Sequence, residues 1–285
     1  MALPRLRMVN SRKMPLSTQD RSASVTAGVL LREWRTARRM SQLDLALEAD
    51  ISSRHLSYVE TGKSQPSREM VVRLAEALAM PLRERNALLL AAGYAPGYPE
   101  TRLNTAHMAQ IRRAIQLTLE HQEPYPAFVF NRYLDILETN TAAVRVAEFL
   151  IGGSTHANML HQLFDPKDLR RAVRNWEEIA SDMMRHLHEA LAANPFDAKM
   201  RGLLDDLLRY PGVPSQWRSH DTTSPPPPVL TVEFKKDDRR LRFFSTFTSF
   251  GTSGDVTIDE LRMECAFPAD EETAETCRAL AGRSR

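Results

Sequence analysis

The side chains best suited to bind another molecule through hydrogen bonds lie in one short segment, residues 53–58. Ser53, Arg54, Ser57 and Tyr58 are three or four positions apart, so on a helix they would share one face. The guanidinium of Arg54 holds several N–H donors in a rigid plane and can donate two parallel hydrogen bonds to a planar acceptor. A face of this kind can contact the edges of nucleic-acid bases, and guanine is the base that arginine pairs with best.

Two short helices, residues 42–49 and 53–60, must position this face. Apolar residues occupy the positions at which the two helices would pack together: Leu43, Leu45, Ala46, Ile51, Leu56 and Val59. A short helix, a tight turn and a second helix with a polar outer face form the arrangement that places the second helix in a DNA major groove. The segment therefore predicts a helix-turn-helix.

The helix pair lies within a longer helical region that runs from about Val29 to Gly93. Serines at positions 41, 52 and 67 stand where side-chain oxygens can accept hydrogen bonds from free N–H groups at helix starts. The run GYAPGYPE, residues 93–100, concentrates glycine and proline and ends the region. We predict an all-α first domain, residues 27–95, with five helices at about 28–39, 42–49, 53–60, 67–79 and 82–92.

Several residues of this domain occur in a specific order: Ser41-Gln42, Ala46, Ile51-Ser52, Glu60, Gly62, Lys63, Pro66 and Ser67. In that order the domain resembles the lambda-repressor/Cro-like, or XRE, family of DNA-binding domains. The resemblance implies that Ser53, Arg54 and Tyr58 face base edges, with Ser57 nearby. It also implies that Gln42 and Lys63 contact phosphates, assisted by the dipole of the helix that starts at Gln42, and that Glu60 pairs with Arg35.

The segments beside this domain are less regular. Residues 1–26 are polar and basic, and we expect a flexible arm that lies along DNA, or else a disordered leader or an overlong start. Residues 1–80 hold 13 Lys and Arg against 8 Asp and Glu, whereas residues 81–285 hold 25 against 28. Residues 96–124 are predicted to be a linker with a helix at 104–121, either a spacer or a dimer seam.

The second domain is predicted to span residues 125–268, with a tail at 269–285 that is acidic and then either helical or frayed. A hairpin is expected at 127–138 about Asn131-Arg132, and a loop at the four prolines 225–228. The expected helices lie at about 140–150, 157–164, 166–193 and 197–209, and three further β runs at 229–235, 240–249 and 256–265. The predicted fold class is therefore a two-domain chain, an all-α five-helix helix-turn-helix domain followed by an α+β domain.

Three stretches of this second domain carry a further likeness: residues 126–143, residues 158–180 with Trp176, and residues 203–221 with Trp217. They resemble the ligand-binding domain of MmyB-like regulators, which implies a PAS-like fold that encloses a fatty-acid-like or other apolar molecule. The chain departs from that pattern at His161, where arginine is usual. It departs again in PPPPVLTVEFKKDDRRLRFFSTF, which replaces a His-Pro…Gly stretch.

Large apolar side chains on the predicted strands and helices are candidates to line such a cavity. They are Phe128, Phe130, Leu134, Phe149, Leu163, Trp176, Phe234 and Phe244, with Ile136 and Phe247 beside them. The alternative for each of these residues is an ordinary place in the core, because aromatic stripes at these spacings also fill cores.

Patterns that would indicate catalysis are missing from the sequence. His186 and His188 are two positions apart and would point to different sides of a helix, which does not suit joint metal ligation. Cys265 and Cys277 match neither a zinc site nor a disulfide framework, and no apolar run reaches the length of a membrane span. We therefore expect no catalytic residue, metal or cofactor, and a cytoplasmic protein that does not contact a membrane.

Together these features predict a sequence-specific transcription regulator that binds double-stranded DNA. A single recognition helix reads few base pairs, so we expect a homodimer on two half-sites. A small apolar ligand in the second domain would modulate it. Two alternatives stay open: a constitutive repressor whose second domain only mediates assembly, and an enzyme or antitoxin partner that uses the first domain for autoregulation.

Overall fold

The computed structural model describes residues 26–219, 229–251 and 254–282. They form two compact units that divide between Gly97 and Tyr98. The predicted basic arm, apart from Thr26, and the proline loop at 225–228 lie outside the described residues. Each unit is described by itself.

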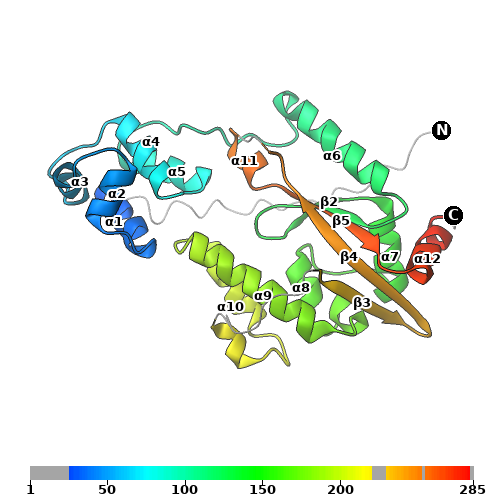
Figure 1. Cartoon of the computed structure of the whole chain (residues 1–285). Helices are drawn as coiled ribbons and strands as arrows, with labels where there is room; N and C mark the ends of the chain where they lie inside the picture. The colour runs from blue at the N-terminus through cyan, green and yellow to red at the C-terminus, as the bar shows by residue number, and fades with distance from the viewer. Residues whose placement is uncertain (1–25, 220–228, 252–253, 283–285) are drawn as a thin grey trace. The chain divides into compact units, whose positions relative to one another are not determined.

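The first unit consists of five short helices, as predicted. They are α1 (Ala27–Ala37), α2 (Gln42–Glu48), α3 (Ser53–Glu60), α4 (Arg68–Ala77) and α5 (Leu82–Ala91), shown in blue to cyan in Figure 1. The first four begin at a hydroxyl side chain that accepts a hydrogen bond from a backbone N–H of the first turn: Thr26, Ser41, Ser52 and Ser67. Helices this short are marginal alone, so such caps help to fix where each begins.

Three of these helices end at a residue in the left-handed backbone region without the help of glycine. Arg39, Asp50 and Ala79 have φ values of 55°, 52° and 47° after α1, α2 and α4. Asp50 forms part of the turn between α2 and α3, where its short polar side chain tolerates this conformation better than most. The turn that separates the two helices of the helix-turn-helix therefore costs some conformational energy.

The core of the first unit is formed by side chains from all five helices. The largest fully buried ones are Leu31, Trp34, Leu45, Leu56, Leu74, Leu78, Leu88 and Leu89. Of the residues expected between the two central helices, Leu45, Ala46, Leu56 and Val59 are buried, but Leu43 is 58% exposed, so its assignment to the inner face is wrong. Leu43 lies on the outer side of α2, together with Leu47 one turn later, which is 71% exposed.

The second unit is built on a five-stranded antiparallel sheet. Its strands are β1 (Ala127–Phe130), β2 (Ile136–Thr139), β3 (Thr231–Lys236), β4 (Arg239–Thr248) and β5 (Arg262–Pro268), in the order β2-β1-β5-β4-β3. The predicted hairpin at 127–138 is confirmed as β1 and β2. Its loop is stabilised by Asn131, whose Oδ1 accepts from the backbone N–H groups of Tyr133 and Asp135.

Helices lie on both sides of this sheet (Figure 1). On one side α6 (Ala109–Gln122), preceded by the short η1 (Ala106–Met108), buries Ile115 and Leu119 against β1 and β5. On the other side lie α7 (Thr141–Ile151), α8 (Met159–Phe164), η2 (Leu169–Ala172), α9 (Trp176–Ala193), α10 (Ala198–Leu207) and η3 (Ser215–Arg218). The two-domain order, all-α and then α+β, is confirmed.

Three local predictions in this unit are wrong or incomplete. The helix expected at 166–193 is broken, because Val173 pairs with Phe234 of β3 and the backbone N–H of Arg174 donates to the Glu233 carbonyl. Trp176 therefore begins α9 instead of lying within a longer helix. The β run expected at 256–265 starts as the helix α11 (Val256–Asp259). The segment assigned to a tail, 269–285, is helical rather than frayed: it contains α12 (Glu271–Gly282), which packs Cys277 against the residues of α7 and β4 and so belongs to the second unit.

Candidate nucleic-acid interface and ligand-binding domain

A buried ion pair holds the end of α3 against α1. Arg35 Nε donates to Glu60 Oε1 at 2.7 Å, and a second guanidinium nitrogen donates to Oε2 at 3.0 Å. The same guanidinium also donates to the Met40 carbonyl at 2.9 Å. The side chain of Glu60 is only 1% exposed. The expected pairing of Arg35 with Glu60 is thereby confirmed, and its bidentate geometry fixes the direction of α3.

Gln42 completes this network. Its side-chain Nε2 donates to Glu60 Oε2 at 2.8 Å, so the start of α2 is tied to the end of α3. Burial alone would raise the pKa of Glu60, but the hydrogen bonds from Arg35 and Gln42 lower it below its ordinary value. The carboxylate is therefore the stable form of Glu60 at neutral pH, as the ion pair requires.

The N-terminus of α2 is already occupied by its own capping residues. Ser41 Oγ accepts from the N–H of Asp44 at 3.1 Å, and the Ser41 N–H donates to the Asp44 carboxylate at 2.8 Å. The hydrogen bonds from Ser41 lower the pKa of Asp44. Since α2 has only seven residues and a carboxylate at its start, a phosphate bound there would depend on side chains rather than on the dipole of this helix.

The outer face of α3 presents the predicted polar residues. Ser53 and Arg54 are exposed, Ser57 is half-buried, and Tyr58 is 39% exposed. Arg54 Nε donates to the Tyr58 hydroxyl at 3.2 Å, and its guanidinium lies over the Tyr58 ring, with Cζ 5.6 Å from the ring centroid. Lys63 Nζ lies 5.9 Å from the centroid of the same ring.

This cluster of Arg54, Tyr58 and Lys63 was not predicted from the sequence, although the i, i+4 spacing of the first two is visible there. Both cations lie near the tyrosine ring, and Arg54 also donates a hydrogen bond to the tyrosine hydroxyl. Each exposed cation–π contact contributes about 0.5–1 kcal/mol. The hydroxyl accepts from Nε, and none of the described residues hydrogen-bonds the two terminal nitrogens of Arg54. Those nitrogens are the donors that a base edge would need.

The eight residues predicted to line a ligand cavity are distributed over the second unit. Leu163 and Trp176 are buried in the core formed by α8, α9 and α10, and Leu134 and Phe234 pack against that core. Phe149 belongs to α7 and packs against the cluster that includes Leu241 and Phe243 of β4. Phe130 is fully buried and stacks on Phe128, and Phe244 stacks on Phe267 across β4 and β5. Whether any of them contacts a ligand stays a prediction.

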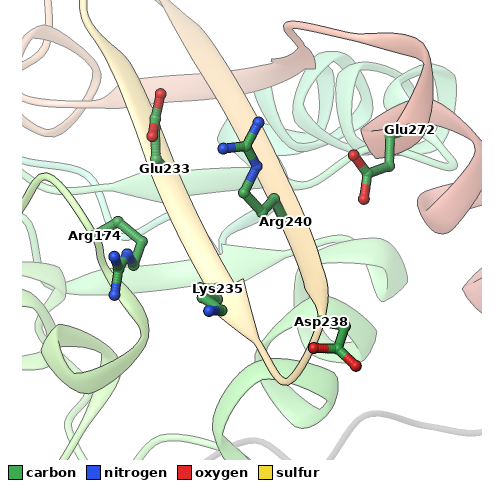
Figure 2. A pocket seen from close by; sticks show the side chains of 6 residues that line it. All are labelled: Arg174, Glu233, Lys235, Asp238, Arg240 and Glu272. Carbon is green, nitrogen blue, oxygen red and sulfur yellow. The ribbon is translucent and has the colours of Figure 1, made fainter.

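Two of the hollows on the described surface of this unit are lined mainly by polar groups. One, of about 400 Å³, is lined by Arg174, Glu233, Lys235, Asp238, Arg240 and Glu272; Figure 2 shows these charged side chains about β3 and β4. The other is lined by Arg170, Val173, Arg174, Asn175, Trp176, Glu177 and Glu178, where Arg170 stacks on Trp176 with Cζ 3.4 Å from the ring centroid. Only Trp176 of the eight predicted residues lines either hollow.

The residue that departs from the family pattern, His161, has a partner. Its Nδ1 lies 3.0 Å from the Tyr210 hydroxyl, while His156 Nε2 lies 2.9 Å from Asp165 Oδ2. Burial, followed by the nearby His156, lowers the pKa of His161. In the part of the chain that the structure describes, no three His, Cys, Asp or Glu side chains gather in a way that could hold a metal ion.

Comparisons with known proteins identify both domains. A family model described as the MmyB-like transcription regulator ligand binding domain matches residues 111–280, more than half of the chain, and a helix-turn-helix model matches residues 31–85. No match was found among the curated proteins. Every helix in the described ranges is too short or too polar to cross a membrane.

Two solved structures are similar to parts of the chain. A restriction-modification controller protein from Aeromonas hydrophila has 36% identity over 21% of this chain and 89% of that protein, with a TM-score of 0.20. An RNA-binding light-oxygen-voltage receptor has 11% identity over 89% of this chain and 63% of that receptor, with a TM-score of 0.23.

The fold, the paired helices and the family models define a DNA-binding transcription regulator with an XRE-type helix-turn-helix domain. The chain belongs to the MmyB-like transcription regulators. Both resemblances drawn from the sequence are thereby confirmed.

Proposed function

We propose that this regulator binds DNA sequence-specifically as a homodimer, in the cytoplasm, and that a small molecule with an apolar, fatty-acid-like body in its second domain alters its DNA affinity. The observation that carries the proposal is the polar face of α3, held in place by the buried pair of Arg35 and Glu60. The Arg54 side chain on that face is exposed and oriented by Tyr58.

The roles proposed for the site residues differ in kind. Arg54, with Ser53 and Ser57, reads base edges, and a bidentate contact from Arg54 to guanine contributes about 1–3 kcal/mol of discrimination. Lys63 contacts phosphate, which supports every sequence equally. The amide nitrogen of Gln42 donates to Glu60 and so ties α2 to α3. Gln42 would have to contact a phosphate while it keeps this hydrogen bond. Tyr58 contributes mainly by orienting its two cationic neighbours.

Substitution of two cations separates these roles. Arg54→Ala should relax the preference at one base pair of each half-site, whereas Lys63→Ala should weaken binding to all sequences and lower the salt slope by about one unit. Arg201→Ala is the matched control, since it removes one exposed positive charge from the second unit. Binding of randomised and preferred duplexes by gel shift over a range of salt concentrations measures both effects. Identical effects of the first two changes would refute the assignment.

Dimerisation and ligand response have separate tests. Sedimentation of the protein with and without its preferred duplex gives the stoichiometry, and a single protein chain per duplex would contradict the dimer. A ligand that binds the native state at a thousand times its dissociation constant stabilises it by about 4 kcal/mol. Heating the protein with extracted lipids should therefore raise its unfolding temperature, while no shift with any fraction would favour a second domain that serves only assembly.

A further inference from the structure

One side of the sheet carries a carboxylate between two aromatic rings. Residues directly opposite each other in antiparallel strands point to the same side. The register pairs Glu264 of β5 with Phe128 of β1 on one flank and with Phe247 of β4 on the other. Phe130 stacks on Phe128 with ring centroids 5.7 Å apart.

These residues lie on the side of the sheet opposite α6. The neighbours of Glu264 along β5, Met263 and Cys265, belong to the cluster that α6 covers, so Glu264 points away from that helix. On the same side as Glu264, the residues nearer the other end of β4, Leu241 and Phe243, are buried in the cluster with α7.

The row about Glu264 is more open than that cluster. Phe247 is 57% exposed, and Phe128 and Glu264 are half-buried. A large aromatic side chain exposed beside further apolar surface is typical of a binding site. An occupant of this row would cover the Phe247 ring and reach the Glu264 carboxylate.

Glu264 has no counter-ion in the described part of the chain. No lysine, arginine or histidine there pairs with it, and its one hydrogen-bond partner is the hydroxyl of Ser245, its diagonal neighbour on β4. Burial raises the pKa of Glu264 in spite of that hydrogen bond. A carboxylate in such surroundings is costly, and a cation that binds it removes the cost.

We propose that this row binds the protonated amino group of a small molecule, with Glu264 as its counter-ion and the rings of Phe128 and Phe247 against its apolar body. Aromatic rings beside a carboxylate suit an ammonium group, because the ring faces attract cations. The inference rests on the proposed ligand-responsive function. The ligand keeps an apolar body, but its head group is basic, whereas that of a fatty acid is acidic.

Three probes of equal chain length test the head group. Octylamine, octanol and octanoate are titrated into the full chain at pH 7.5 and followed by calorimetry. Octylamine should bind about 10-fold or more tightly than octanol, and octanoate more weakly than either, because a hydrogen bond between charged groups is worth about a factor of 10 or more.

Three variants locate the site. Glu264→Gln should lower octylamine affinity about 10-fold and leave octanol affinity within about 2-fold, since only the charge changes. Glu138→Gln is the matched control, because Glu138 pairs with Val129 and so lies on the α6 side of the sheet. Phe247→Ala, at a position exposed enough to tolerate the change, should weaken octylamine and octanol alike.

The inference is overturned if octanoate binds as tightly as octylamine, if neither binds, or if Glu264→Gln leaves octylamine affinity unchanged. Tight binding of octanoate alone would overturn the basic head group while keeping an apolar ligand in the proposed function. A gel shift on the same preparation tests DNA binding separately. If the protein shows no sequence preference there, the proposed function is refuted whether or not octylamine binds.

Discussion

Gly28 lies where α1 crosses the end of α3, and the crossing leaves no room for a side chain. A Cβ added at Gly28 would stand 2.4 Å from the Val59 carbonyl oxygen and 2.8 Å from the Glu60 carbonyl oxygen. Both atoms are backbone, so no side chain can rotate away, and the two helices must separate by about 1 Å to restore an ordinary contact.

Gly28→Ala should therefore destabilise the first unit. Overpacking at a site of this kind costs up to about 3 kcal/mol, and the better helix propensity of alanine returns about 1 kcal/mol. We expect a net loss of about 2 kcal/mol. Because Glu60 holds α3 through Arg35 and Gln42, the same shift should lower DNA affinity.

Hydrogen exchange of peptides from α1 to α3, measured by mass spectrometry over a urea series, gives the stability of this unit alone. Gly202→Ala is the matched control: Gly202 lies within α10, and nothing would stand within 4 Å of its added Cβ. That change should stabilise the second unit by about 0.5–1 kcal/mol. If Gly28→Ala left the exchange of α1 and α3 unchanged to within about 0.5 kcal/mol, the argument from this crossing would be wrong.

Three further predictions concern titratable and aromatic groups. Tyr58→Phe removes the hydroxyl that accepts from Arg54 but keeps the ring, so affinity for the preferred duplex should fall about 5-fold with an unchanged salt slope, and an unchanged affinity in gel shifts would contradict this role. Glu60→Gln should cost about 2 kcal/mol at neutral pH. Since the pKa of Glu60 is lowered on folding, that difference should be complete above pH 4.5 and shrink as the pH falls further in urea titrations; a constant difference would refute the ion pair. Burial raises the pKa of Cys277 to about 11 and also raises that of Cys265. A thiol reagent at pH 8 should therefore label neither cysteine in the native protein and both in urea. Rapid labelling of the native protein would contradict their burial.

The fold of the first unit could be predicted because its information is local. Serine caps and apolar periodicity determine where each helix begins and which face it buries. Leu43 shows the limit: a leucine at the right spacing can still lie on the outer side of α2. In the second unit the break between η2 and α9 depends on Val173 pairing with β3, a partner about sixty positions later, and no local pattern reports such a contact.

The site that we propose in the second unit was harder to predict for the same reason. On a strand, neighbours in sequence point to opposite sides, so the members of one side come from strands that are distant in the chain. Phe128 and Phe247 lie opposite Glu264 because of the register of three strands. In the sequence the two phenylalanines are only separate apolar positions, far apart in the chain. A carboxylate within β5 looks like a solvated residue until that register is known. An apolar ligand could therefore be proposed from the sequence, whereas the basic head group that we propose for it depends on which strand lies beside which.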